Sequence, residues 1–174
     1  FSKFKFDSSV LEIVFKQVLG VIYIPVFLSF LVLIRNGNDG ISWIFFLLIL
    51  VFVGDTAAYY AGTYFGRHKL CPAVSPNKTI EGSVGGLAAN LVVGALFKYF
   101  FMPSLSWGLS LLCFFSIGAA GQVGDLFESE LKRASHIKDS GTLFPGHGGI
   151  LDRIDALLFA APVAYFFKEY VLTG

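Results

Sequence analysis

Five long, largely apolar runs limit what this chain can fold into. Each approaches or exceeds the roughly 20 residues that a helix needs to cross the hydrocarbon core of a bilayer. Charged residues make up 14% of the chain, against roughly 25% in ordinary globular domains. Backbone polar groups cannot stay unpaired in lipid, so the runs are predicted to be helices. The expected spans are residues 17–34, 41–66, 82–101, 105–124 and 150–172.

The predicted fold class is therefore all-α, a polytopic transmembrane helix bundle of about five spans within residues 17–174. The fourth helix could run on into DLFESELKR, beyond residue 124. Residues 1–16 mix Lys with Phe, which is typical of a segment on the membrane surface. The chain begins with Phe1 rather than Met, so we expect it to be a fragment or to lack an ordered N-terminal part.

Basic residues predict how the bundle is oriented. With five spans, the N-terminus and the connections 67–81 and 125–149 fall on one side of the membrane. Basic residues concentrate on that side, which marks it as cytoplasmic. They are Lys3, Lys5, Arg67, Lys69, Lys78, Lys132, Arg133 and Lys138, against Arg35, Lys98 and Lys168 on the other side. Both large polar loops are therefore expected in the cytoplasm, where nucleotides are found.

Three aspartates lie where polar loops meet apolar runs. Asp152 and Asp155 are three residues apart, which places them on one face of a helix. Asp125 ends the fourth apolar run and could project into the same region. Magnesium typically takes one or two carboxylates together with substrate phosphates. The three carboxylates therefore predict a magnesium site, although acids in a first helical turn also favour the helix dipole without any metal.

The loop before the last span carries residues suited to phosphate. Gly148 and Gly149 follow His147 directly ahead of the helix, and a helix N-terminus with free N–H groups binds anions. Lys132, Arg133 and Lys138 would add positive charge. Each feature has a simpler explanation, because glycines also end loops, a histidine can order a loop, and basic clusters also contact lipid headgroups.

Two further groups could contact a substrate. In SPNKTIEG, residues 75–82, the side chains of Ser75, Asn77, Lys78 and Thr79 can donate hydrogen bonds to a phosphate or a base. The same stretch could equally be the start of a helix. Asp55 lies in the middle of the second span. An acid within a membrane span is a functional candidate by default, although it could also hold helices together through a hydrogen bond.

The segment SELKRASHIKDSGTLFPGHGGILDRID, residues 129–155, resembles the signature of the phosphatidate cytidylyltransferases, also called CDP-diacylglycerol synthases. All fixed positions of that signature are filled. They are Ser129, Lys132, Arg133, Lys138, Asp139, Pro145, His147, Gly148, Gly149, Asp152, Arg153 and Asp155. The upstream segments GDTAAYYAGTYFG and SPNKTIEG are also similar to that family, so the resemblance covers most of residues 54–155.

The resemblance implies a reaction in which CTP and phosphatidic acid give CDP-diacylglycerol and pyrophosphate, for phospholipid biosynthesis in a bacterial inner or cell membrane. It implies Mg²⁺ on Asp125, Asp152 and Asp155, with a second cation compatible. Asp152, Lys138 and Ser129 would be catalytic. The substrate-binding residues would be Asp55, Ser75, Asn77, Lys78, Thr79, Lys132, Arg133, His147, Gly148 and Gly149. The partners expected are CTP, phosphatidic acid and membrane lipid, with no nucleic acid; a homodimer is compatible.

Two other functions compete with this interpretation. CTP-dependent polyprenol or phytol kinases resemble the family loosely, but the complete signature argues against them. A cation transporter could use Asp55, Asp125 and Asp152 as a path, but it would leave the basic loops and the His-Gly-Gly element unexplained. CDP-alcohol phosphatidyltransferases also use membrane aspartates, but the DG…AR element ahead of the paired aspartates is not found here.

Overall fold

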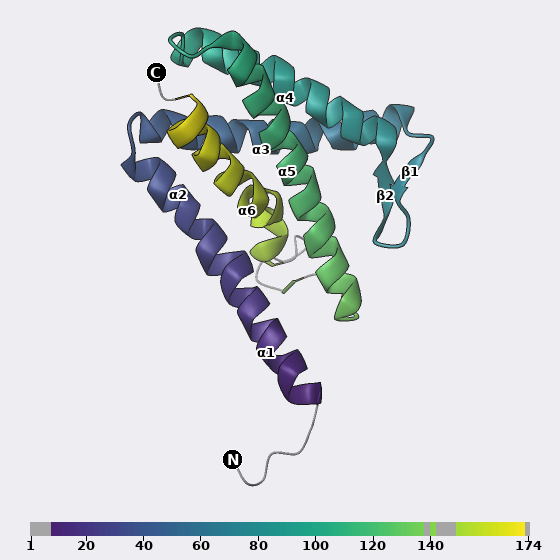
Figure 1. Cartoon of the computed structure of the whole chain (residues 1–174). Helices are drawn as coiled ribbons and strands as arrows, with labels where there is room; N and C mark the ends of the chain where they lie inside the picture. The colour runs from purple at the N-terminus through teal and green to yellow at the C-terminus, as the bar shows by residue number, and fades with distance from the viewer. Residues whose placement is uncertain (1–7, 138–139, 142–148, 173–174) are drawn as a thin grey trace.

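A computed structural model describes residues 8–137, 140–141 and 149–172 of the chain. The described part is mostly helical, with one short hairpin (Figure 1). The elements are α1 (Ser8–Val21), η1 (Ile22–Val26), α2 (Phe27–Asn36), α3 (Gly40–Phe65), β1 (Lys69–Cys71), β2 (Ser75–Thr79), α4 (Ile80–Phe101), α5 (Trp107–Ala134), α6 (Leu151–Phe166) and η2 (Phe167–Val171). The all-α fold class predicted from the sequence is confirmed.

The first three elements form one long rod. α1 runs into α2 through η1, a short π-helical stretch that contains Pro25. Proline has no N–H to donate within a helix, which accounts for a local change in helix type. Residues 8–16, which the sequence suggested for a surface segment, are helical and lead without a break into the first span.

Among the described residues, four helices are long and apolar enough to cross a membrane. They are Leu11–Asn36, Gly40–Phe65, Ile80–Phe101 and Trp107–Ala134, and they agree with four of the expected spans. The fifth expected span forms α6 and η2 and is not among the four. It carries Asp152, Arg153, Asp155, Lys168 and Glu169. α5 continues to Ala134, so the first ten residues of the expected loop 125–149 are helical.

Helices α3 and α4 lie side by side because small residues line their contact (Figure 1). A Cβ on Gly82 would lie 2.7 Å from the Ala58 carbonyl oxygen, and one on Gly86 would lie 2.9 Å from the Gly54 carbonyl oxygen. Small residues at every fourth position allow helix backbones to approach closely in membranes. The spacing recurs along both helices, so the two backbones are in contact over several turns.

The apolar core lies towards the end of the bundle away from the hairpin. Phe46 of α3 contacts Phe97 of α4 and Phe114 of α5, with ring centroids 5.3 Å apart in both pairs. Ala160 and Ala164 of α6 are fully buried against the same cluster. This packing fixes α3, α4, α5 and α6 relative to one another and leaves their other ends free to form a polar region.

Two lysines lie buried at that same end of the bundle. Lys98 is 2% exposed, and its Nζ lies 4.1 Å from the centroid of the Trp107 ring. It also donates a hydrogen bond to the Pro103 carbonyl, at 3.5 Å. Lys168 pairs with Glu169 close to Gly37. A carbonyl, an aromatic face and a carboxylate thus accommodate the two charges.

Candidate functional site

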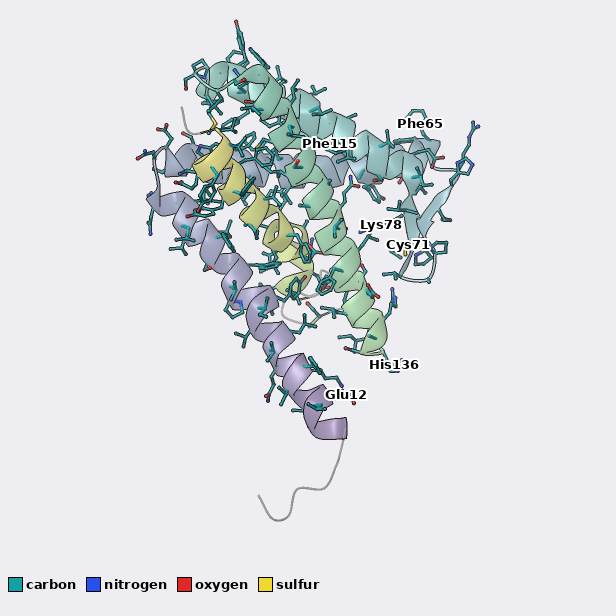
Figure 2. The ribbon with its side chains drawn as sticks, viewed as in Figure 1. Glu12, Phe65, Cys71, Lys78, Phe115 and His136 are labelled. Carbon is teal, nitrogen blue, oxygen red and sulfur yellow. The ribbon has the colours of Figure 1, made fainter. Side chains whose placement is uncertain are left out.

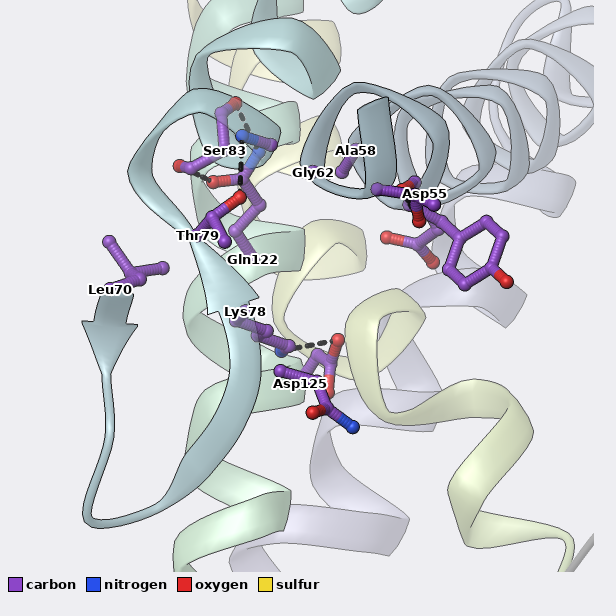
Figure 3. A pocket seen from close by; sticks show the side chains of 13 residues that line it. Asp55, Ala58, Gly62, Leu70, Lys78, Thr79, Ser83, Gln122 and Asp125 are labelled. Atoms are coloured by element: carbon purple, nitrogen blue, oxygen red, sulfur yellow. Dashed lines mark hydrogen bonds and ion pairs between the residues drawn. The ribbon is translucent and has the colours of Figure 1, made fainter. Parts of the chain in front are cut away.

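A cavity of about 470 Å³ lies where α3, the hairpin, α4 and α5 meet (Figure 3). Its size falls within the range of small-molecule sites. α3 contributes both apolar and polar residues to its walls, and the other three elements contribute mainly polar groups. The lining residues are Asp55, Ala58, Tyr59, Gly62, Thr63, Leu70, Asn77, Lys78, Thr79, Gly82, Ser83, Gln122 and Asp125.

One face of α3 forms a long wall of this cavity. Asp55, Ala58, Tyr59, Gly62 and Thr63 all line it, and their spacing of three or four residues places them on one helical face. With a rise of about 1.5 Å per residue, the wall from Asp55 to Thr63 is about 12 Å long. The intramembrane acid singled out in the sequence therefore belongs to the same cavity as the polar loop at residues 75–82.

Lys78 and Asp125 face each other across the cavity. Lys78 Nζ lies 2.5 Å from Asp125 Oδ2 (Figure 3). Lys78 comes from β2 and lies on the side of the hairpin that faces α5 (Figure 2), whereas Asp125 lies in the second half of α5. The sequence singled out both residues, and the structure brings them together as an ion pair.

The hairpin and the start of α4 are held by side-chain caps. The Thr79 hydroxyl accepts a hydrogen bond from the Gly82 N–H, at 3.1 Å, as the N-cap of α4. Glu81 accepts from the backbone N–H groups of Arg67 and His68, at 3.1 and 3.2 Å. Thr79 thus starts a helix and also lines the cavity, so the two interpretations of this stretch are compatible.

Ser83 and Gln122 add a polar pair to the cavity wall. The Ser83 hydroxyl donates to the Gln122 side-chain oxygen, and Gln122 Nε2 donates to the Ser83 carbonyl at 2.9 Å. The sequence interpretation missed both residues. One signal was present, because Gln122 precedes Asp125 by three residues and so shares its face of α5.

Asp152 is the centre of a second polar cluster, at the start of α6. Its Oδ1 lies 2.7 Å from Lys132 Nζ of α5. Its Oδ2 accepts from the Ser140 N–H, the Ser140 hydroxyl and the Gly149 N–H, at 2.9, 2.8 and 2.7 Å. Burial on its own would raise the pKa of this carboxyl, but the Lys132 ammonium and the donated hydrogen bonds hold that pKa well below its usual range. Asp152 is therefore anionic and joins the loop to α5.

Glu128 belongs to this second cluster and was not singled out from the sequence. It is 1% exposed, and its carboxylate pairs with Lys132 one helical turn later. A buried charge needs a partner, so Glu128 and Asp152 together fix the Lys132 side chain. Its spacing was a usable signal, since Glu128 follows Asp125 by three residues and precedes Lys132 by four.

The three aspartates proposed for a metal come from α5 and α6. Asp155 lies within electrostatic range of Asp125, and so does Asp55 from α3. Among the described side chains, no group of three or more His, Cys, Asp or Glu is close enough to hold a metal ion. The donors nevertheless fit a hard cation, because carboxylate oxygens are its preferred ligands and Asp125 already attracts the Lys78 ammonium. The metal site stays a prediction.

The other predicted site residues lie around these two clusters. Asn77 lines the cavity, and Ser75 is the first residue of β2 and does not line it. Arg133 donates to the Val74 carbonyl at the hairpin turn, at 3.3 Å. Ser129 lies in α5 one turn after Asp125 and is half-buried. Lys138, His147 and Gly148 lie outside the described residues, together with Asp139 and Pro145 of the signature.

A family model and similar proteins from two bacterial genera all point to cytidylyltransferases. A family model described as the cytidylyltransferase family matches residues 3–171. The phosphatidate cytidylyltransferase of Bacillus subtilis (strain 168) is 41% identical over 149 residues, which cover 85% of this chain and 55% of that protein. The phosphatidate cytidylyltransferase of Staphylococcus haemolyticus (strain JCSC1435) is 43% identical over 136 residues, which cover 78% of this chain and 52% of that protein.

The chain thus spans about half the length of the curated relatives it matches. Its matched region includes the cavity, the Lys78–Asp125 pair and the cluster around Asp152. The match extends over nearly the whole chain rather than over the signature segment alone. On this evidence, the chain belongs to the cytidylyltransferase family.

Proposed function

We propose that the protein transfers CMP from CTP to phosphatidic acid, giving CDP-diacylglycerol and pyrophosphate. The observation that carries the proposal is the Lys78–Asp125 pair inside a cavity that reaches from the hairpin to Asp55 in a membrane span. Such a cavity suits a reaction that joins a water-soluble nucleotide to a lipid headgroup. The names of the similar proteins from Bacillus and Staphylococcus support the same activity.

In the proposed reaction, an anionic oxygen of phosphatidic acid attacks the α-phosphorus of CTP. A new P–O bond forms, the bond between the α-phosphorus and its bridging oxygen breaks, and pyrophosphate leaves with that oxygen. The nucleophile already carries a negative charge, so no strong general base is required. The protein must mainly position the two phosphates and neutralise the charge that develops.

The charged side chains divide these tasks. On binding of the nucleotide, Lys78 would exchange Asp125 for a phosphate oxygen, because both are anionic oxygen partners. Lys132 is held by Glu128 and Asp152, so it would offer a fixed positive charge. Asp152 would keep the Gly149 N–H and Ser140 in place at the start of α6.

We propose Mg²⁺ as the metal, held by Asp125 and Asp155 with Asp152 at the edge of the same region. Bound there, the ion would supply neutralisation of the nucleotide phosphates. Asp125 would then have two cationic partners in turn, the Lys78 ammonium and the metal. We also place the site at the cytoplasmic face of a bacterial cell membrane, in keeping with the basic residues of the connections 67–81 and 125–149.

Radiolabelled CTP tests the proposal and its rivals together. With phosphatidic acid and Mg²⁺ in detergent, [α-³²P]CTP should label the lipid fraction and [γ-³²P]CTP should label released pyrophosphate. A CTP-dependent lipid kinase would give the reverse, with γ-label in the lipid. A cation transporter would label neither product, and either of these results would overturn the proposal. Light scattering of the detergent complex tests whether the protein forms a homodimer, with which the sequence is compatible.

A further inference from the structure

Tyr59 is the only aromatic residue among the described side chains that line the cavity. It lines the cavity, and yet 67% of its surface is exposed. Ala58 and Gly62, its neighbours on the same wall, have no large side chain to present. Tyr59 therefore stands at the rim, where the cavity opens beside a candidate membrane span.

The outer surface of α3 continues this rim with two more tyrosines. The Tyr59 and Tyr60 ring centroids are 5.4 Å apart, and those of Tyr60 and Tyr64 are 6.3 Å apart. All three side chains are exposed. Tyrosines gather at the membrane–water boundary, where an apolar ring and a polar hydroxyl are both accommodated. The opening next to Tyr59 is thus at the depth of lipid headgroups and the first part of their chains.

The cavity offers both charged and apolar surface. Lys78, Gln122 and Asp125 give it a polar side, and Lys78 is complementary to a phosphate. On α3, Ala58, Tyr59 and Gly62 form an apolar stretch between Asp55 and Thr63. Pockets of this size hold roughly one drug-sized ligand, so a nucleotide and a lipid phosphate leave no room for two long acyl chains. The chains must leave the cavity on the side of the bilayer.

From this arrangement we propose that Tyr59 forms the lipid-facing mouth of the cavity and binds the part of phosphatidic acid where its glycerol joins the acyl chains. Tyr59 is then a residue that determines affinity for the lipid and not for the nucleotide. The inference rests on the proposed function and extends it, because it assigns the two substrates to different ends of one cavity. The occupant is a single phosphatidic acid molecule.

Steady-state kinetics in mixed micelles test this assignment. In Tyr59→Ala, the apparent KM for dioleoyl phosphatidic acid should rise about 5-fold, the scale of one lost aromatic contact. KM for CTP should stay at the wild-type value, and Tyr59→Phe should restore most of the lipid affinity. Tyr64→Ala is the matched control, since Tyr64 is also exposed on α3 but does not line this cavity. An equal rise in KM for CTP, or the same lipid KM in both alanine variants, overturns the proposal.

A second measurement does not depend on turnover. In Tyr59→Trp, phosphatidic acid with brominated acyl chains should quench the added fluorescence more than brominated phosphatidylcholine does, after subtraction of the signal from Trp43 and Trp107. Equal quenching by the two lipids would contradict a specific lipid mouth. If the protein makes no CDP-diacylglycerol but this preference is present, the proposed reaction fails while the lipid site stands. If the reaction proceeds without the preference, only the inference about Tyr59 fails.

Discussion

Two lysines determine how the charged residues of the site are arranged. Lys78 reaches from the hairpin to Asp125, and Lys132 lies between Glu128 and Asp152. In a low-dielectric setting each of these charges needs its partner. A substitution that removes one carboxylate therefore changes the position of a lysine as well as the local charge.

Asp152→Asn is expected to lower kcat about 100-fold or more, the scale of losing one preorganised electrostatic group. The amide lacks the charge, and its single oxygen cannot serve the donors that now share two oxygens. Lys132 would keep Glu128 as a partner, so the variant should still fold and insert. Turnover in detergent and thermal unfolding measure the two effects separately.

The control for this substitution is Asp39→Asn. Asp39 is exposed in the turn before α3 and has a φ of 50°, a conformation that asparagine tolerates well. It should leave both kcat and the unfolding temperature unchanged. Wild-type turnover of Asp152→Asn at saturating Mg²⁺ would remove Asp152 from the site.

Lys78→Ala should raise KM for CTP by roughly 10-fold or more, since a hydrogen bond to a charged group is lost. Lys69 is the comparison, because it lies in β1 of the same hairpin, is exposed and does not line the cavity. Lys69→Ala should change KM for CTP little. Small and equal effects in the two variants would favour a purely topological role for both lysines.

The sequence indicated Lys78 and Asp125 as separate site residues but could not show that they form an ion pair. Lys78 and Asp125 lie in different elements, and only the packing of α3, α4 and α5 places one opposite the other. Glu128 escaped notice for a different reason, since its spacing from Asp125 and Lys132 was visible in the sequence but its burial was not. Asp125, Asp152 and Asp155 were predicted to share a metal, and this remains a prediction.

At the scale of elements, the hairpin was the part least visible in the sequence. β1 has three residues, and β2 contains Pro76, so the stretch lacks the alternating pattern by which strands are predicted. Its form comes instead from Glu81, which binds the backbone at its start, and from Arg133, which binds its turn. The helices were predictable because lipid leaves the backbone no alternative.

The contact between α3 and α4 gives a prediction at this scale. Gly86→Ala should lower the free energy of unfolding by about 1–3 kcal/mol, the usual cost of overpacking. The added methyl would meet the Gly54 carbonyl at 2.9 Å and Ala58 Cβ at 3.0 Å. Gly108→Ala in α5 is the matched control, because nothing lies within 4 Å of its added Cβ. The free energies of unfolding of the two variants are compared in the same detergent, and equal stability would contradict the close contact.

At the scale of the whole molecule, the membrane imposes one orientation on all these parts. If the four candidate spans cross the bilayer in alternating directions, the hairpin and the end of α5 are expected on one side and the α2–α3 turn on the other. Hydropathy gave four of the five expected spans and their approximate limits, whereas the fifth is not among the candidate spans of the described residues. Whether α6 and η2 cross the membrane was harder to predict, because their sequence combines apolar residues with several charged ones.

Cysteine labelling checks this orientation. In a background with Cys71→Ser, a cysteine at Ser135 should react with an impermeant thiol reagent only from the cytoplasmic side. A cysteine at Asn38 should react only from the opposite side. Both positions are exposed, whereas Cys113 is buried and should stay silent. Reversed labelling would place the cavity on the side without CTP.

The close backbone contact of α3 and α4 also has a mechanical consequence. Because α3 and α4 meet largely through glycines and alanines, they cannot slide or tilt against each other without collision, so the pair should move as one rigid unit. Asp55 of α3 and Ser83 of α4, which both line the cavity, belong to this unit. Adjustment to a substrate must then come from the hairpin, whose contacts with α5 are made by single side chains, Lys78 and Arg133. Hydrogen–deuterium exchange should accordingly be slow along residues 54–62 and 82–90 and faster in residues 69–79.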